Sequence, residues 1–262
     1  MIFGIYIFLV GLCIGSFLNV CIYRIPEDIS IVAPRSRCGS CETVLKPLDL
    51  IPLLSYAFLG GKCRYCGERI SLRYPLVELV TGLLFLLAYL QFGMTITMVG
   101  SMCFIALLIT VFFIDFDHMI IPNELVALGI VIGLAINVYL WIGGQYTMFF
   151  LSSKSSGIIG ALVGSGILLL ISIISSLIYG GQSAIGMGDV KLFAVIGLFL
   201  GWELTLLTLW LSFIIGGIIG VVLIFVFKMD RKAAIPFGPF IVTAAFVSMF
   251  VGSKLIFMLF GI

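Results

Sequence analysis

Long stretches almost free of charge constrain the fold of this chain more than any other feature. Eight such stretches run through the sequence, at 1–23, 76–91, 94–114, 125–142, 157–180, 184–202, 204–227 and 235–253. A helix that crosses a bilayer needs about 20 apolar residues, and only helices or closed barrels satisfy their backbone groups in lipid. The sequence has no alternating pattern typical of a barrel. It therefore predicts an all-α polytopic membrane protein with about eight transmembrane helices.

The distribution of lysine and arginine predicts how these helices are oriented. Eight of the 14 basic residues lie in the segment 24–73. Cytoplasmic loops carry an excess of Lys and Arg, so this segment is expected inside and the N-terminus outside. Since no Lys or Arg precedes Arg24, a retained first helix is favoured over a cleaved signal peptide. Threading eight spans then leaves two basic residues outside, Lys154 and Lys254, and four more inside: Lys191, Lys228, Arg231 and Lys232.

Four cysteines in the segment 24–73 have the spacing of a metal site. They form Cys38-x2-Cys41 and Cys63-x2-Cys66, with 21 residues between the pairs. Two such pairs are typical of a closed tetrahedral zinc site, in which four thiolates leave no open position for water. Disulfides are the alternative, disfavoured because cytoplasmic thiols are kept reduced. We expect structural Zn²⁺ in a small zinc-ribbon-like insertion, with domains at 1–23 (first transmembrane helix), 24–73 (cytoplasmic four-cysteine domain) and 74–262 (membrane domain).

Two aspartates at the predicted membrane edge are the candidate catalytic residues. Asp115 ends the third apolar stretch, and Asp189 follows Gly186, Met187 and Gly188. A charge at the centre of a spanning helix costs about 2.5–3.5 kcal/mol, so a carboxylate there is a functional candidate. Paired carboxylates catalyse hydrolysis by dividing the roles of proton acceptor and proton donor. The threading brings both sites to the cytoplasmic side.

Neighbouring residues leave alternatives open. Residues two apart on a helix do not face one another, so Asp117 is expected to be a solvated charge rather than a partner of Asp115. His118 is either a proton relay or an interfacial side chain. Asp189 alone could be a helix-capping carboxylate. Lys191 is either a membrane anchor or a group that holds Asp189.

A second set of residues is predicted to contact substrate. Glycines let a backbone approach closely, which makes Gly186 and Gly188 candidates together with Lys191. The segment 235–240 contains Pro236 and Gly238 and opens the last predicted span. Prolines there can simply favour a helix start, or they can leave backbone groups free to grip an extended substrate.

Taken together, these motifs resemble those of the bacterial prepilin peptidases, which are type IV prepilin leader peptidases and N-methyltransferases. The run Gly-Ser-Phe-Leu-Asn-Val at 15–20 with Tyr-Arg-Ile-Pro at 23–26 is similar to the N-terminal signature of that family. The four-cysteine segment, Asp115 seven residues before Pro122, and Asp189 in Gly-x-Gly-Asp with Lys191 also match. Segment 236–240 looks like a family segment as well. The resemblance covers nearly the whole chain.

The resemblance implies an intramembrane-type aspartic endopeptidase of the Gly-x-Gly-Asp class, with Asp115 and Asp189 as its catalytic pair. Its substrates would be prepilins and pseudopilins of type IV pili, protein secretion or competence systems. It would cut after the glycine that ends a short basic leader, on the cytoplasmic side of the plasma membrane. It would then methylate the new N-terminal amine with S-adenosylmethionine.

Two other classes of function use some of the same residues. A polytopic transporter would use Asp115 and Asp189 in an ion pathway. A zinc metalloprotease is disfavoured, because His-Glu-x-x-His is absent and His118 is the one histidine. We expect prepilins and membrane lipid as partners, and no nucleic acid.

Overall fold

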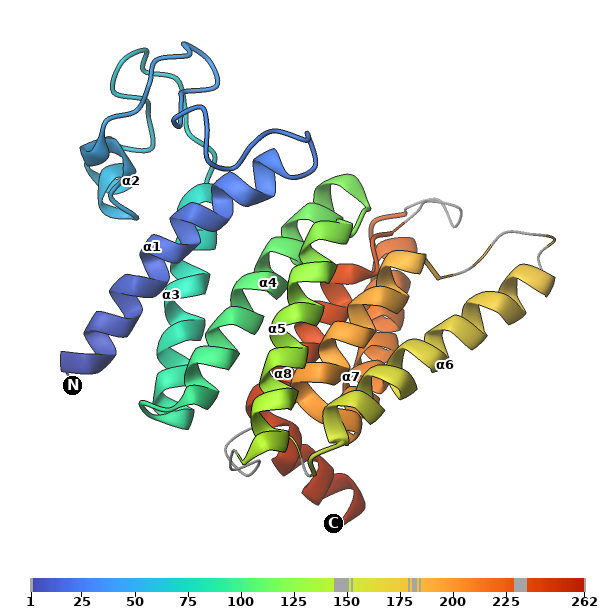
Figure 1. Cartoon of the computed structure of the whole chain (residues 1–262). Coiled ribbons are helices and arrows are strands. Elements are labelled where there is room, and N and C mark those ends of the chain that lie inside the picture. Colours follow the sequence, from blue (N-terminus) through green and yellow to red (C-terminus); the bar gives the residue numbers. More distant parts are fainter. Residues whose placement is uncertain are drawn as a thin grey trace. The chain divides into compact units, whose positions relative to one another are not determined.

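The structure is a computed structural model of the chain. It describes residues 2–143, 151, 153–178, 180, 183, 185–228 and 235–261. Regular structure in these ranges is helical, apart from two isolated β-bridges, Arg37 with Val44 and Lys62 with Arg69 (Figure 1). The predicted all-α class is therefore confirmed.

Seven of the helices in the described ranges are long and apolar enough to cross a membrane. They are α1 (Ile2–Arg24), α3 (Arg73–Phe92), α4 (Ile96–His118), α5 (Asn123–Ile142), α6 (Ser156–Ile178), α7 (Met187–Phe225) and α8 (Gly238–Phe260). Two short elements, η1 (Pro47–Leu50) and α2 (Leu54–Phe58), lie between α1 and α3. The chain is thus a multi-pass membrane protein.

The longest helix, α7, consists of two segments. Its 39 residues are interrupted at Gly201, whose φ of 76° and ψ of 173° are not helical. The chain reverses there, because a Cβ on Gly164 of α6 would meet both Phe193, before Gly201, and Thr205, after it, at 3.2 and 2.6 Å. Gly252 near the end of α8 lies against Leu204, whereas Gly216 lies against Phe240 at the start of α8. The second segment of α7 therefore runs antiparallel to α8. The reversal separates the predicted stretches 184–202 and 204–227, so the seven long helices contain the eight apolar segments that the sequence predicts.

Contacts divide the chain into two compact units, 1–110 and 111–262. In the first unit, α1 packs closely on α3. A Cβ on Gly11 would lie 2.7 Å from the Cα of Gly82, and one on Gly15 would lie 2.7 Å from the Cα of Glu78. Asn19 adds a polar link, since its Nδ2 donates to the carbonyl of Tyr74 at 3.1 Å. Small residues at such crossings let helix backbones approach within the membrane.

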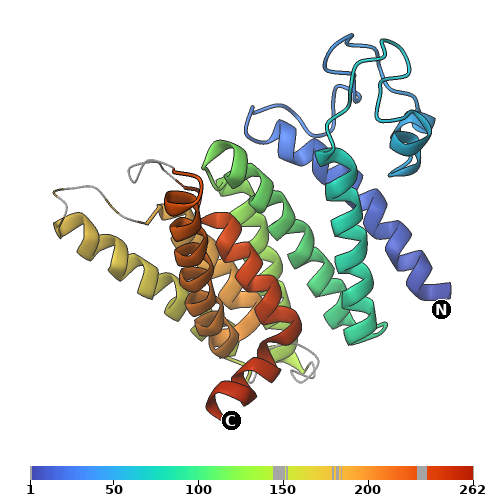
Figure 2. The same ribbon diagram turned by 180° about the vertical axis from the view of Figure 1, so that it is seen from behind.

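In the second unit, α6 crosses α7 next to the reversal (Figures 1 and 2). A Cβ on Gly160 of α6 would lie 2.7 Å from the carbonyl carbon of Gly201 and 2.8 Å from the carbonyl oxygen of Gly197. Both neighbours are backbone atoms, which cannot move aside as a flexible side chain can. The glycines therefore set the distance between the two helices, and the core of this unit forms around α7.

Replacing Gly160 by alanine should weaken the second unit. We expect Gly160→Ala to lower stability by about 1–3 kcal/mol, the usual cost of overpacking, and to lower the melting temperature in detergent. Gly166→Ala on the same helix is the matched control, because nothing lies within 4 Å of its Cβ position. Both variants gain the same helix propensity. Equal melting temperatures for the two variants would contradict the close crossing.

Candidate active site and metal centre

Asp115 lies in the last full turn of α4 with its side chain buried. The helix ends just after it, because Met119 takes a φ of 55° and its N–H donates to the Asp115 carbonyl at 2.9 Å. Asp115 is 5% exposed, whereas Asp117 and His118 are exposed. This difference follows from helical spacing, which turns position 117 away from position 115.

The buried carboxylate of Asp115 is held by the first residue of α8. The backbone N–H of Gly238 donates to Asp115 Oδ2 at 2.8 Å. A Cβ on Gly238 would lie only 2.5 Å from that same oxygen. Glycine is therefore required for this approach. Pro236 lies half-buried just before it, and Phe237 packs its ring 5.6 Å from that of Phe213 on α7.

Asp189 lies in the first turn of α7 and is 8% exposed. It interacts electrostatically with Asp115, so the fold brings together two carboxylates that are 74 positions apart. Its Oδ2 lies 3.3 Å from the Cβ position of Gly186, the residue before α7. A side chain at position 186 would therefore press on the carboxylate.

The loop after Asp115 contacts the turn that carries Asp189. A Cβ on Gly188 would lie 3.1 Å from the Cβ of Ile121. Lys191 Nζ donates to Oδ1 of Asn123, the first residue of α5, at 2.8 Å. Neither predicted role of Lys191, as a membrane anchor or as a group that holds Asp189, includes this contact with Asn123. The lysine joins the start of α7 to the start of α5.

The four predicted metal ligands also lie together. The Sγ atoms of Cys38, Cys41, Cys63 and Cys66 are all within 4.8 Å of one another, and those of Cys38 and Cys66 are 3.9 Å apart. A tetrahedral zinc site with Zn–S bonds of about 2.3 Å places sulfurs about 3.8 Å apart. The cluster therefore fits a metal ion with four thiolate ligands.

Each cysteine pair belongs to a turn of the same design, which we call a knuckle. In the first knuckle (37–44), the N–H of Cys38 donates to Thr43 and the N–H of Glu42 to Cys38. The second knuckle (62–69) repeats both bonds, from Cys63 to Glu68 and from Gly67 to Cys63. Glu42 and Gly67 occupy the same position, with φ values of 54° and 74°. One β-bridge closes each knuckle.

Backbone groups in the knuckles favour thiolates. The N–H groups of Cys41 and Ser40 hold the pKa of Cys38 below its ordinary value, and those of Cys66 and Tyr65 do the same for Cys63. The Glu68 backbone acts likewise on Cys66, but desolvation and hydrogen bonds with the other cysteines raise its pKa to about 12. A bound divalent cation would offset this conflict, because its positive charge stabilises the deprotonated form of each coordinating thiol.

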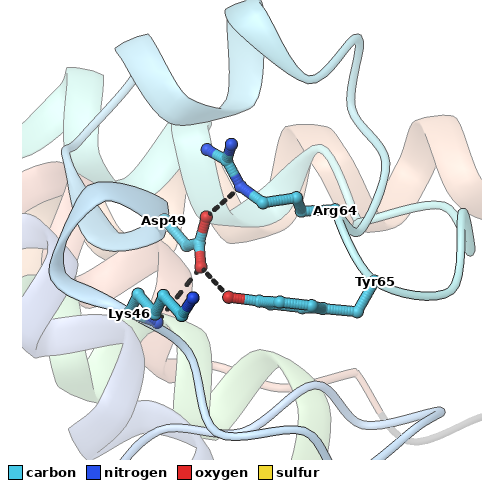
Figure 3. Close-up of polar contacts among 4 residues, drawn as sticks. All are labelled: Lys46, Asp49, Arg64 and Tyr65. Atoms are coloured by element: carbon cyan, nitrogen blue, oxygen red, sulfur yellow. Dashed lines mark hydrogen bonds and ion pairs between the residues drawn. The ribbon is translucent and has the colours of Figure 1, made fainter.

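Asp49, in the turn η1, contacts the second knuckle (Figure 3). Arg64 Nε donates to its Oδ1 at 2.6 Å, while the Tyr65 hydroxyl and the Lys46 N–H donate to Oδ2 at 2.9 and 3.1 Å. Burial raises the pKa of Asp49, but these donors outweigh burial and hold the pKa below its usual range. The same carboxylate raises the pKa of the Tyr65 phenol, which keeps its proton to donate.

Sequence reasoning did not identify Asn123, Ile121 or Asp49. Each is an ordinary residue type for its segment, and its contacts involve a residue 15 or more positions away. Only the folded chain brings such partners together. Two basic residues used to predict orientation, Arg231 and Lys232, lie outside the described residues.

Comparison with known proteins gives two matching family models. Residues 9–92 match the bacterial peptidase A24 N-terminal domain, and residues 102–221 match the type IV leader peptidase family. No solved structure matches the chain.

Several relatives are named prepilin leader peptidase/N-methyltransferase. One from Myxococcus xanthus is 49% identical over 52% of this chain and 40% of its own length, and one from Bacillus subtilis is 46% identical over 45% and 48%. The chain thus spans less than half of these two relatives. A third, from Legionella pneumophila, is 33% identical over 95% of this chain and 91% of its own length. With nearly its whole length aligned to this relative and both family models matched, the chain belongs to the type IV leader peptidase family.

Proposed function

We propose that this protein is a membrane aspartic endopeptidase that removes the leader peptide of prepilins and pseudopilins. One observation supports this most strongly: Asp115 and Asp189 are buried at helix ends and interact with each other. The names of the relatives supply the substrate class. A transporter is not favoured, since the matched family is one of peptidases.

The proposed reaction divides the proton transfers between the two aspartates. One carboxylate takes a proton from water as the water attacks the scissile carbonyl, and the other donates a proton to the departing amine. Asp115 Oδ2 already accepts the Gly238 N–H, so a proton carried by Asp115 belongs on Oδ1. The Gly238 contact thereby aims one oxygen of the pair at the reaction.

We infer supporting roles for the surrounding residues. Gly238 positions Asp115 in addition to the substrate contact predicted for it together with Pro236. Gly186 leaves space beside Asp189 for an extended substrate backbone, and Gly188 lets the turn that carries Asp189 lie against Ile121. Lys191 lies exposed two residues beyond Asp189, where it can meet substrate as well as Asn123.

We further propose that the enzyme methylates the amine that cleavage releases. The relatives' names combine both activities. S-adenosylmethionine is then the second substrate, and its sulfonium supplies the methyl group. The amine exists only once the peptide bond has been cut, so methylation follows cleavage, and the amine must lose its proton before it attacks that methyl carbon.

The four-cysteine cluster is proposed to hold one structural Zn²⁺ through Cys38, Cys41, Cys63 and Cys66. Four thiolates complete a tetrahedral site, so the metal stabilises the fold of the segment and activates no water. We propose the segment 24–73 as a cytoplasmic domain and 74–262 as the membrane peptidase domain. The excess of basic residues in 24–73 supports an outside N-terminus and a dyad on the cytoplasmic side.

Removal of either carboxylate should abolish cleavage. Asp115→Asn and Asp189→Asn each delete one proton-transfer group, which typically contributes about 10²–10⁴-fold to rate. Asp117→Asn is the matched control, because its side chain is exposed on the same helix. Cleavage of a model prepilin by purified protein measures the effect. Full activity in Asp115→Asn or Asp189→Asn would refute the aspartic mechanism.

A methyl group at position 238 should disturb the reaction without removing any catalytic group. The added Cβ of Gly238→Ala would lie 2.5 Å from Asp115 Oδ2 and displace the carboxylate. Misplacement by about 1 Å can cost about 10²-fold in rate. Gly217→Ala controls for the change of residue type, since its Cβ position is open. The initial rate of leader cleavage is the readout, and equal rates for the two variants would rule out the positioning role of Gly238.

The purified protein should contain one zinc per chain. Cys38→Ser removes one of four ligands and should lower zinc content and loosen the segment 24–73, while leader cleavage falls less. Cys13→Ser, a cysteine of α1 outside the cluster, should leave zinc content unchanged. Elemental analysis measures the metal, and thiol alkylation measures exposure of the cysteines. Wild-type protein without zinc, with all four thiols alkylated rapidly, would disprove the metal site.

A further inference from the structure

The buried carboxylate of Asp49 contacts the second knuckle at both residues that separate its cysteines. Arg64 and Tyr65 are the two residues between Cys63 and Cys66, and each donates to a different oxygen of Asp49. The Asp49 side chain is only 5% exposed. Its third donor, the Lys46 N–H, fixes the carboxylate to the turn η1. The carboxylate thus holds the two residues that lie between a pair of metal ligands, from outside the metal site.

The first knuckle has no equivalent of the contact between Asp49 and the second knuckle. The residues between Cys38 and Cys41 are Gly39 and Ser40, and a glycine with a serine cannot form the same two-sided contact. The backbone bonds of the two knuckles are otherwise alike. The contact with Asp49 is therefore an addition to the second knuckle, not a requirement of the turn.

We propose that Asp49 is a positioning residue of the metal centre, which holds Cys63 and Cys66 in ligand geometry before the ion binds. The second knuckle is then the preformed half of the site, and the first knuckle closes over the ion. This inference rests on the proposed zinc site. Groups that orient ligands from the second layer typically contribute about 10–100-fold to metal affinity.

The contribution of Asp49 to zinc affinity comes from the geometry of its hydrogen bonds more than from its net charge. The Arg64 side chain is 49% exposed, and an ion pair with an exposed partner contributes little by itself. The Asp49 carboxylate, in contrast, joins the turn η1 to the second knuckle through three donors, and its loss would leave the Lys46 N–H and the Tyr65 hydroxyl without an acceptor. A neutral amide at position 49 can accept at one oxygen only. Asp49→Asn should therefore weaken the contact without changing side-chain volume.

The experiment measures zinc affinity of the full-length protein in detergent by competition with a chromophoric chelator. We expect Asp49→Asn to bind Zn²⁺ about tenfold more weakly, which corresponds to about 1.4 kcal/mol. Glu27→Gln is the control, because it removes an exposed carboxylate of the segment 24–73 outside both knuckles; its affinity should equal that of wild type. Tyr65→Phe should show part of the loss. The double variant Asp49→Asn/Tyr65→Phe should lose less than the sum, since both changes remove the same contact.

A second measurement separates positioning from general loosening. After zinc removal, pulse alkylation followed by trypsin and mass spectrometry reports each knuckle by itself, because cleavage after Arg37 and Lys62 separates Cys38 and Cys41 from the second knuckle. Cleavage after Arg64 also places Cys63 and Cys66 on separate peptides, so each is followed by itself. Asp49→Asn should speed alkylation of Cys63 and Cys66 more than that of Cys38 and Cys41.

Three outcomes decide the proposal. Equal zinc affinity in Asp49→Asn and wild type overturns it, as does a uniform rise in alkylation at both knuckles. Wild-type protein that binds no zinc refutes the metal site itself, which is a different failure. If Asp49→Asn does not fold, Tyr65→Phe tests the same contact, and wild-type affinity in that variant overturns the inference.

Discussion

The hydrogen bond from the Gly238 N–H to Asp115 is the interaction on which the membrane site depends. It joins the end of α4 to the start of α8 across 123 positions of sequence. A buried carboxylate without a donor is costly, and the exposed N–H groups of a helix start are natural anion partners. One contact thus satisfies Asp115, fixes the first turn of α8 and leaves the other carboxylate oxygen available.

Glycines make the close approaches in the second unit possible at three places. Gly238 admits the carboxylate, Gly160 admits the backbone of α7, and Gly201 lets α7 reverse. In water, burial of large apolar side chains drives helices together. Lipid offers no such drive, so close backbone contact and polar links replace it. The bond from Asn19 to Tyr74 serves this purpose in the first unit.

Much of this architecture could be predicted from sequence because hydropathy and spacing are local. Apolar runs identified the spans, including the division of α7, and cysteine spacing identified the set of thiols that the structure brings together. The convergence of Asp115 and Asp189 followed from threading the chain through a membrane. The contacts of Gly238 and Asp49 could not be predicted in this way. Gly238 donates to a residue 123 positions away. In the sequence, Asp49 resembles a solvated carboxylate of a polar segment, and only the folded chain places the Arg64 and Tyr65 donors against it.

The reversal at Gly201 has a consequence for the lipid around the protein. The first segment of α7, residues 187–200, has 14 residues and spans about 21 Å at 1.5 Å per residue. The hydrocarbon layer is about 30 Å thick, and a segment that is too short is accommodated by local thinning of the bilayer or by flanking polar groups. Asp189 begins this short segment. Water from the nearby aqueous phase therefore has a shorter path to Asp189 than to a residue at the same place on a full-length span, and bilayer thickness becomes a physical variable of the proposed hydrolysis.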